Sequence, residues 1–131
     1  MSTTDPRPAL IRNAFAGFQA RDLAAFVDFL HPELESSVKP PLLNTGTWHG
    51  PMGLMAMTNG WEEAFGEISY DIRGIELVDD RNAFVAVRQE ATGAESGVPV
   101  VLDVIFLIEF EGEQAIRIQV HPNRESAQAA L

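Results

Sequence analysis

The spacing of apolar residues changes near residue 67, and this change most strongly constrains the fold. Before it, apolar residues recur every three or four positions, which is the period of a helix buried along one side. This spacing predicts helices over 8–20, from Asp22 to Leu30, and from Gly50 onward. The third helix carries a stripe of large side chains: Leu54, Met57, Thr58, Trp61 and Phe65.

In the second half, apolar and polar residues alternate, which is typical of strands. Strands are expected at 68–78, 83–92, 98–111 and 115–121, joined by Asp-, Asn- and Gly-rich hairpin turns. A short strand at 34–38 and a proline-rich loop at 39–46 precede the third helix, and a short helix at 124–131 ends the chain. Helices followed by an antiparallel set of strands indicate an α+β fold, and we expect a single domain over 1–131.

The composition excludes several classes of function. The chain has 19 acidic and 9 basic residues and a formal net charge of −10, which opposes binding to nucleic acid and to anionic membranes. It contains no cysteine, which excludes disulfides, thiol catalysis and cysteine metal sites. Its three histidines lack the spacing of metal ligands. We expect no metal, no other cofactor, no secretory signal in residues 1–8 and a cytoplasmic location.

The strand at 98–111 is apolar on both sides. One side carries Leu102, Val104, Phe106, Ile108 and Phe110. The other side carries Val101, Ile105 and Leu107. The helices can cover one side, and the second needs another partner. We therefore expect a homodimer built through Val101, Ile105 and Leu107.

Several short segments together resemble the SnoaL-like proteins. These segments are Arg21-Asp22-Leu23, Gly46-Thr47-Trp48-His49-Gly50, Ser96-Gly97-Val98 and Asn123-Arg124-Glu125-Ser126-Ala127. SnoaL-like proteins belong to the nuclear transport factor 2-like superfamily, with ketosteroid isomerases and limonene epoxide hydrolases. The resemblance implies a cone-shaped, curved antiparallel sheet wrapped around three N-terminal helices, a deep pocket between them, and a dimer. Because one fold hosts many activities, the site residues must be compared one by one.

The resemblance does not extend to the chemistry of ketosteroid isomerases. Those enzymes use a carboxylate base with a tyrosine and a protonated aspartic acid as oxyanion donors. The corresponding positions here fall on Ser36 or Ser37, near Ala14, and on Phe106. We therefore expect no such isomerisation, and an apolar pocket wall at Phe106.

Other relatives imply a partial set of catalytic groups. SnoaL-type cyclases use an aspartate just after the last strand, where this chain has Asn123. Epoxide hydrolases add an Arg and an Asp on the second long strand, where this chain has Arg88 and Glu90. His121, close to Asn123, is of the type that titrates near neutral pH. The candidate catalytic residues are therefore Arg88, Glu90, His121 and Asn123.

Each candidate also has a structural interpretation. Arg88 and Glu90 share a strand face, where an exposed ion pair is the alternative to a pocket pair, since Val85 and Val87 alternate with them. Asn123 suits the cap of the last helix. The expected pocket wall is formed by Phe18, Ser37, Met57, Trp61, Phe106, Ile108 and Val120.

Two functions remain open at this point. The first is binding of a small apolar molecule, with cofactor-free isomerase, cyclase or hydrolase chemistry acting on it. The second is a non-catalytic ligand-binding or dimerisation module of the same fold. An Arg88–Glu90 pair inside the pocket would favour the enzyme.

Overall fold

The computed structural model describes residues 5–20, 22–42, 44–92 and 97–131, and it confirms an α+β fold. The first half contains α1 (Arg7–Gln19), α2 (Leu23–Phe29), β1 (Leu30–Val38), β2 (Gly46–His49) and α3 (Gly50–Phe65). The second half contains β3 (Ile68–Leu77), β4 (Asn82–Thr92), β5 (Pro99–Glu111), β6 (Gln114–His121) and α4 (Arg124–Ala129).

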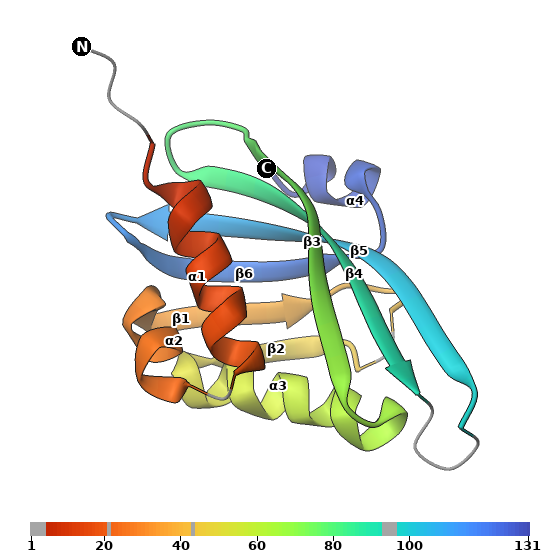
Figure 1. The fold of residues 1–131 in the computed structure, drawn as a ribbon. Helices are drawn as coiled ribbons and strands as arrows, with labels where there is room; N and C mark the ends of the chain where they lie inside the picture. The colour runs from red at the N-terminus through yellow and green to blue at the C-terminus, as the bar shows by residue number, and fades with distance from the viewer. Residues whose placement is uncertain (1–4, 21, 43, 93–96) are drawn as a thin grey trace.

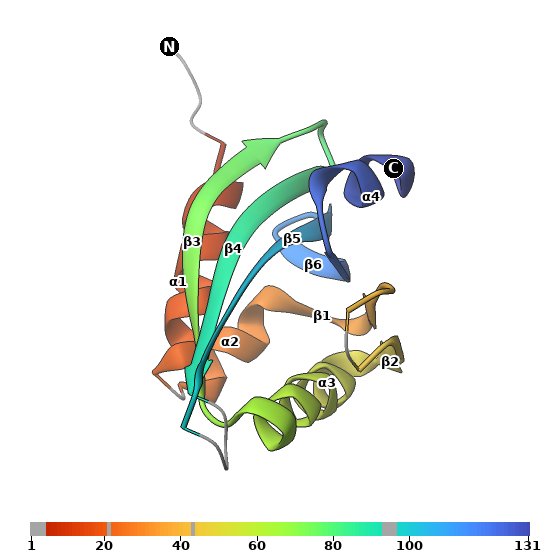
Figure 2. The same cartoon turned by 90° about the vertical axis from the view of Figure 1, so that its right-hand side faces the viewer.

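The described strands form a curved, open, six-stranded sheet in the order β2-β1-β6-β5-β4-β3 (Figures 1 and 2). β3 to β6 pair antiparallel with their neighbours in sequence, as the alternation and the hairpin turns predict. The register shifts between Ile72 and Gly74 and between Glu109 and Phe110. Such irregularities increase the local twist, which helps the sheet to curve.

The segment before α3 differs from the expectation of a short strand and a long loop. β1 begins at Leu30 and runs parallel to β6, and β2 pairs antiparallel with the other edge of β1. Gly50 has a φ of 74° where the chain turns from β2 into α3, a conformation that glycine adopts without strain. These pairings depend on partners far away in the sequence, so local spacing does not reveal them.

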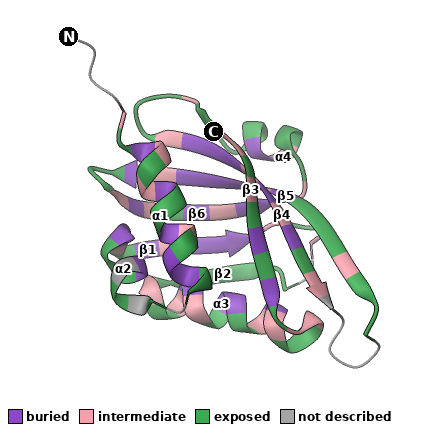
Figure 3. Ribbon diagram, viewed as in Figure 1, coloured by how far each residue is buried: buried purple, intermediate pink, exposed green. Residues whose placement is uncertain are grey.

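Helices cover the two faces of the sheet unequally. α1, α2 and α3 lie on the concave face, whereas α4 lies on the convex face (Figure 2). The main apolar core fills the concave side. Burial along β5 begins only at Val104, so the first residues of β5 extend beyond the core (Figure 3). The sheet therefore has an open end formed by β3, β4 and the start of β5.

The expectation that nothing in the chain covers the convex face is wrong for one of its three residues. Leu107 is 4% exposed and packs with Phe84 and with Ala127 of α4. Val101 is 56% exposed, and Ile105 is partly buried at the edge of this cluster. The apolar surface left on the convex face is therefore smaller than the alternation along β5 suggests.

Candidate functional site

A cavity of about 230 Å³ opens at the open end of the sheet, between α3 and the strands. We call it the mouth pocket, and it is lined by Pro41, Leu42, Trp61, Phe65, Ile68, Gln89, Ala91, Val100, Val101, Leu102 and Val104. Apart from Gln89, these residues are apolar. A pocket with apolar walls and few polar groups is typical of small-molecule sites.

A second cavity, of about 40 Å³, lies deeper in the cone. Its wall is formed by apolar and aromatic side chains of α1, α2, α3 and the sheet, including Phe15, Phe18, Tyr70 and Phe106. Trp61 lines both cavities, which places its indole at their boundary. We call this second space the inner cavity.

Gln89 and Ser36, on the concave face, each have a buried polar atom without a hydrogen-bond partner among the described residues. Gln89 is 6% exposed and Ser36 is fully buried, and Nε2 of Gln89 and Oγ of Ser36 are unpaired. Leaving a buried donor or acceptor unpaired costs about 1–3 kcal/mol. Gln89 was not among the residues predicted to line the pocket, although it continues the alternation of Val85 and Val87 and so shares their face.

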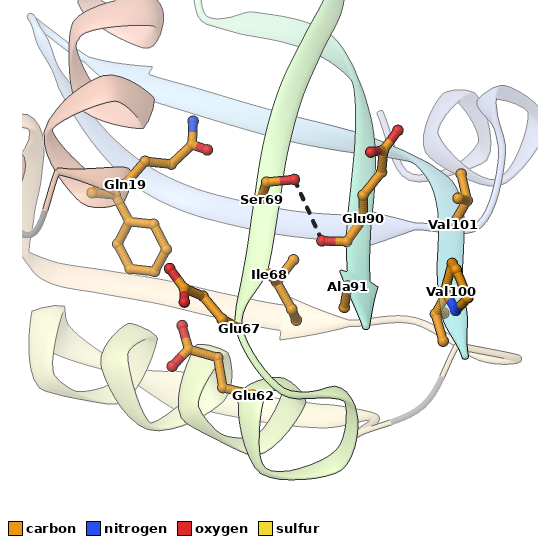
Figure 4. Close-up of a pocket in the computed structure, with 11 residues that line it drawn as sticks. Gln19, Glu62, Glu67, Ile68, Ser69, Glu90, Ala91, Val100 and Val101 are labelled. Carbon is orange, nitrogen blue, oxygen red and sulfur yellow. Dashed lines mark hydrogen bonds between the residues drawn. The ribbon is translucent and has the colours of Figure 1, made fainter. Parts of the chain in front are cut away.

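An acidic hollow of about 570 Å³ adjoins the mouth pocket (Figure 4). It is lined by Phe18, Gln19, Glu62, Glu67, Ile68, Ser69, Glu90, Ala91, Pro99, Val100 and Val101. In Figure 4 the carboxylates of Glu62 and Glu67 lie on one side of β3 and that of Glu90 lies on the other. No lysine or arginine is among these lining residues, so the hollow disfavours anions near the pocket.

Arg88 and Glu90 do not form a pair inside the pocket. Arg88 lies on the convex face, where its Nε donates to Oδ1 of Asp103 at 2.9 Å and its Nη2 donates to Oδ2 at 3.3 Å. This hydrogen bonding raises the pKa of Arg88 and lowers that of Asp103. Glu90 is exposed and borders the acidic hollow. Arg88 therefore forms a solvent-exposed ion pair, which was the structural alternative to a pocket pair, but its partner is Asp103 and not Glu90.

His121 and Asn123 hold α4 against the convex face. His121 is 2% exposed, with Nδ1 2.7 Å from Oγ of Ser126 and Nε2 2.9 Å from Oε1 of Gln119. Because the amide oxygen of Gln119 can only accept, Nε2 carries the proton and Nδ1 accepts from the Ser126 hydroxyl. Asn123 caps α4, since its Oδ1 accepts from the backbone N of Ser126 at 2.9 Å. Neither side chain is among the residues that line the mouth pocket or the inner cavity.

The buried position of His121 predicts a pH-dependent stability. Burial, and to a smaller extent Lys39, lowers the pKa of His121 below its ordinary value of 6.5. As the pH falls below that value, the unfolded chain takes up a proton that the folded chain does not. This group therefore lowers the free energy of unfolding by at most about 1.4 kcal/mol for each unit by which the pH decreases.

Replacing His121 with glutamine is expected to remove this contribution. Urea unfolding between about pH 7 and pH 5 should show a smaller loss of unfolding free energy for His121→Gln than for the wild-type protein. His49→Gln, at the exposed end of β2, is the matched control and should keep the wild-type slope. Equal slopes for all three proteins would contradict the prediction.

The structure places the expected pocket residues in three groups. Five line the inner cavity: Phe18, Met57, Trp61, Phe106 and Ile108. Val120 is fully buried beside Phe106 on the concave face, but it does not line either cavity. Ser37 is a correction, because it pairs with Gln119, which pairs with Leu107. This register places Ser37 on the convex face, opposite to Phe106.

In the part of the chain that the structure describes, the His, Asp and Glu side chains form no group of three or more that could hold a metal ion. None of its helices is both long enough and apolar enough to span a membrane.

The sequence matches a known family over most of its length. The model of the SnoaL-like domain matches residues 11–118. No curated protein sequence is significantly similar to the chain.

Solved structures of low sequence identity share the fold. TerC, co-crystallised with polyporic acid, has a TM-score of 0.79 at 18% identity, covering 95% of this chain and 97% of its own. A candidate SnoaL-like polyketide cyclase from Jannaschia sp. CCS1 has a TM-score of 0.75 at 14% identity, covering 99% and 96%. A protein with a ketosteroid isomerase-like fold from Catenulispora acidiphila DSM 44928, in complex with trimethylamine, has a TM-score of 0.74 at 11% identity, covering 93% and 91%.

Proposed function

Because the chain belongs to the SnoaL-like domain family, we propose that it binds a small, largely apolar molecule in the mouth pocket. The observation that carries this proposal is the cavity of about 230 Å³ whose described lining residues are apolar except for Gln89. Burying the apolar surface of a ligand against Trp61, Phe65 and the strands supplies the driving force, at about 25 cal/mol per Å².

Binding is better supported than acid–base catalysis. Among the described residues that line the mouth pocket and the inner cavity, none is Asp, Glu, His, Lys or Arg. A general acid or base must lie within hydrogen-bond reach of the proton that it transfers. The lining residues therefore favour a pocket that binds a ligand without catalysis. None of the four candidate catalytic residues lines either cavity: Arg88, Glu90, His121 and Asn123.

The structural relatives agree with a role in small-molecule binding. TerC was co-crystallised with polyporic acid, and the Catenulispora acidiphila protein is in complex with trimethylamine. These proteins share the fold with this chain at less than 20% identity. They support the proposal that this chain binds a small molecule. The chemical class of that molecule has to be inferred from the residues that line this chain's own pocket.

The proposal is tested by filling the pocket. Ala91 lines the mouth pocket, and Ala91→Phe is expected to weaken binding of Nile red, a neutral apolar dye, by at least about tenfold, since the added ring occupies the ligand's space. Ala86 lies on the same strand but pairs with Ile105 on the convex face, so Ala86→Phe is the matched control. Fluorescence titration measures both. Absence of dye binding to the wild-type protein, or equal binding by both variants, would contradict the proposal.

We also propose that two copies of the chain form a homodimer through the convex face. Val101 and the partly buried Ile105 lie on this face, and Arg88, paired with Asp103, lies beside them. Asp103 lies between Val101 and Ile105 along β5, so this interface would combine apolar contacts with a central ion pair, and interfaces commonly contain both apolar contacts and hydrogen bonds.

A further inference from the structure

Among the described residues that line the mouth pocket, Gln89 is the polar one. Only 6% of its surface is exposed, yet its Nε2 has no hydrogen-bond partner. Buried polar groups in native proteins are nearly always paired, so an exception calls for an explanation. A ligand that accepts a hydrogen bond would supply the missing partner.

The sheet register shows which residues surround Gln89 in the wall of the mouth pocket. Tyr70, Gln89 and Leu102 are direct neighbours across β3, β4 and β5. The next row toward the open end is apolar, with Ile68, Ala91 and Val100. Trp61 and Phe65 of α3 contribute aromatic rings to the same pocket. The pocket thus offers aromatic rings from the helix and a hydrogen-bond donor from the sheet.

The charges around the pocket limit which acceptor can enter. The described residues of the mouth pocket carry no charge, and the adjoining acidic hollow carries Glu62, Glu67 and Glu90. A carboxylate or phosphate would lose its hydration, find no cation among the described lining residues and be repelled by the carboxylates of the hollow. A neutral carbonyl oxygen needs a single donor and is far less costly to bury.

We propose that the mouth pocket selects a neutral, apolar molecule bearing a carbonyl oxygen, which accepts a hydrogen bond from Nε2 of Gln89. The terminal torsion of a glutamine side chain is broad, so the amide can turn its donor toward the ligand. This inference rests on the proposed function, because it names the class of molecule that the same pocket binds. Gln89 acts as a specificity-determining residue in this scheme.

The test compares matched aromatic probes by displacement of Nile red. The probes are 2-acetylnaphthalene, 2-ethylnaphthalene, which lacks the carbonyl oxygen, and the anion 2-naphthoate. Gln89→Met preserves the length of the side chain and removes the donor. We expect this variant to change the ratio of ketone to hydrocarbon dissociation constants by about tenfold in favour of the hydrocarbon, the value of one hydrogen bond. The anion should bind most weakly to both proteins.

Two further variants complete the test. Gln128→Met, on the exposed face of α4, makes the same exchange away from the pocket and should keep the wild-type ratio. Gln89→Leu is a second replacement that removes the donor, and it decides the outcome if Gln89→Met does not fold. Because the Nε2 of Gln89 has no partner in the ligand-free protein, both Gln89 variants should melt at or above the wild-type temperature.

The outcomes separate this inference from the proposed function. If both neutral probes bind and the ratio is unchanged in the Gln89 variants, the hydrogen bond is refuted while the apolar pocket stands. Tighter binding of the anion than of the ketone would overturn the inference in the same way. If neither the dye nor any probe binds to the wild-type protein, the proposed function fails and the inference fails with it.

Discussion

Replacing Phe106 with aspartate is expected to lower the free energy of unfolding by at least about 4 kcal/mol. Phe106 is 7% exposed, lines the inner cavity and packs edge to face on Phe15 with 5.5 Å between ring centroids. The exchange removes the ring and leaves a carboxyl group beside Val85 and Val120, its cross-strand neighbours. Because domains of this size are stable by about 5–15 kcal/mol, the variant should be close to unfolding.

The pH dependence of this variant distinguishes a buried carboxyl from a simple void. Burial raises the pKa of a carboxyl group, so the penalty is largest at neutral pH and eases as the pH falls and the group becomes neutral. Urea unfolding at neutral and mildly acidic pH measures both effects. Leu102→Asp is the matched control, because Leu102 lies on the same strand and face but is 40% exposed. An equal cost for the two variants would show that Phe106 does not face the cavity.

Replacing Ile105 with glutamate is expected to weaken the proposed homodimer by at least about a hundredfold in dissociation constant. The reason is that an interface through the convex face would bury the new charge without a partner. The arrangement of this face supports the choice of Ile105, since Leu107 is already covered by α4 and Val101 lies nearer the open end. Sedimentation velocity at micromolar concentration would detect the shift from dimer to monomer.

A charge placed elsewhere should not have this effect. Met52 of α3 is 81% exposed, and α3 and α4 lie on opposite faces of the sheet (Figure 2), so Met52→Glu adds the same charge outside the proposed interface. This control should sediment as the wild-type protein does. A wild-type protein that is already monomeric, or equal dissociation in both variants, would refute a dimer through the convex face.

The sequence predicted the helices and the antiparallel strands because their signals are local. The alternation along β3 to β6 and the turn residues between them identify both the strands and their pairing. Gly112, with a φ of 64°, occupies the predicted turn between β5 and β6. The family resemblance, drawn from short segments along the chain, is confirmed by the match over residues 11–118.

The site was predicted less well, because its residues depend on which side chains face the pocket. Ser36 and Ser37 are both buried and, as neighbours on a strand, point to opposite faces, but only the pairing of β1 with β6 shows which of them lies on the concave face. Arg88 attracted attention as a candidate catalytic residue, whereas its neighbour Gln89 lies in the pocket wall. The charge of Arg88 made it the more obvious candidate for catalysis, but the position of each residue along β4 determines that Gln89, and not Arg88, lines the mouth pocket.

The sequence by itself therefore determined the order of helices and strands, the α+β class and the family. These follow from the period of apolar residues and from turn residues, which act over a few neighbours. The tertiary structure decided the parallel pairing of β1 with β6, the addition of β2, the cover that α4 gives to Leu107 and the entry of Gln89 into the mouth pocket. Each of these depends on register between segments distant in the chain, and a shift of one residue would exchange the two faces of a strand.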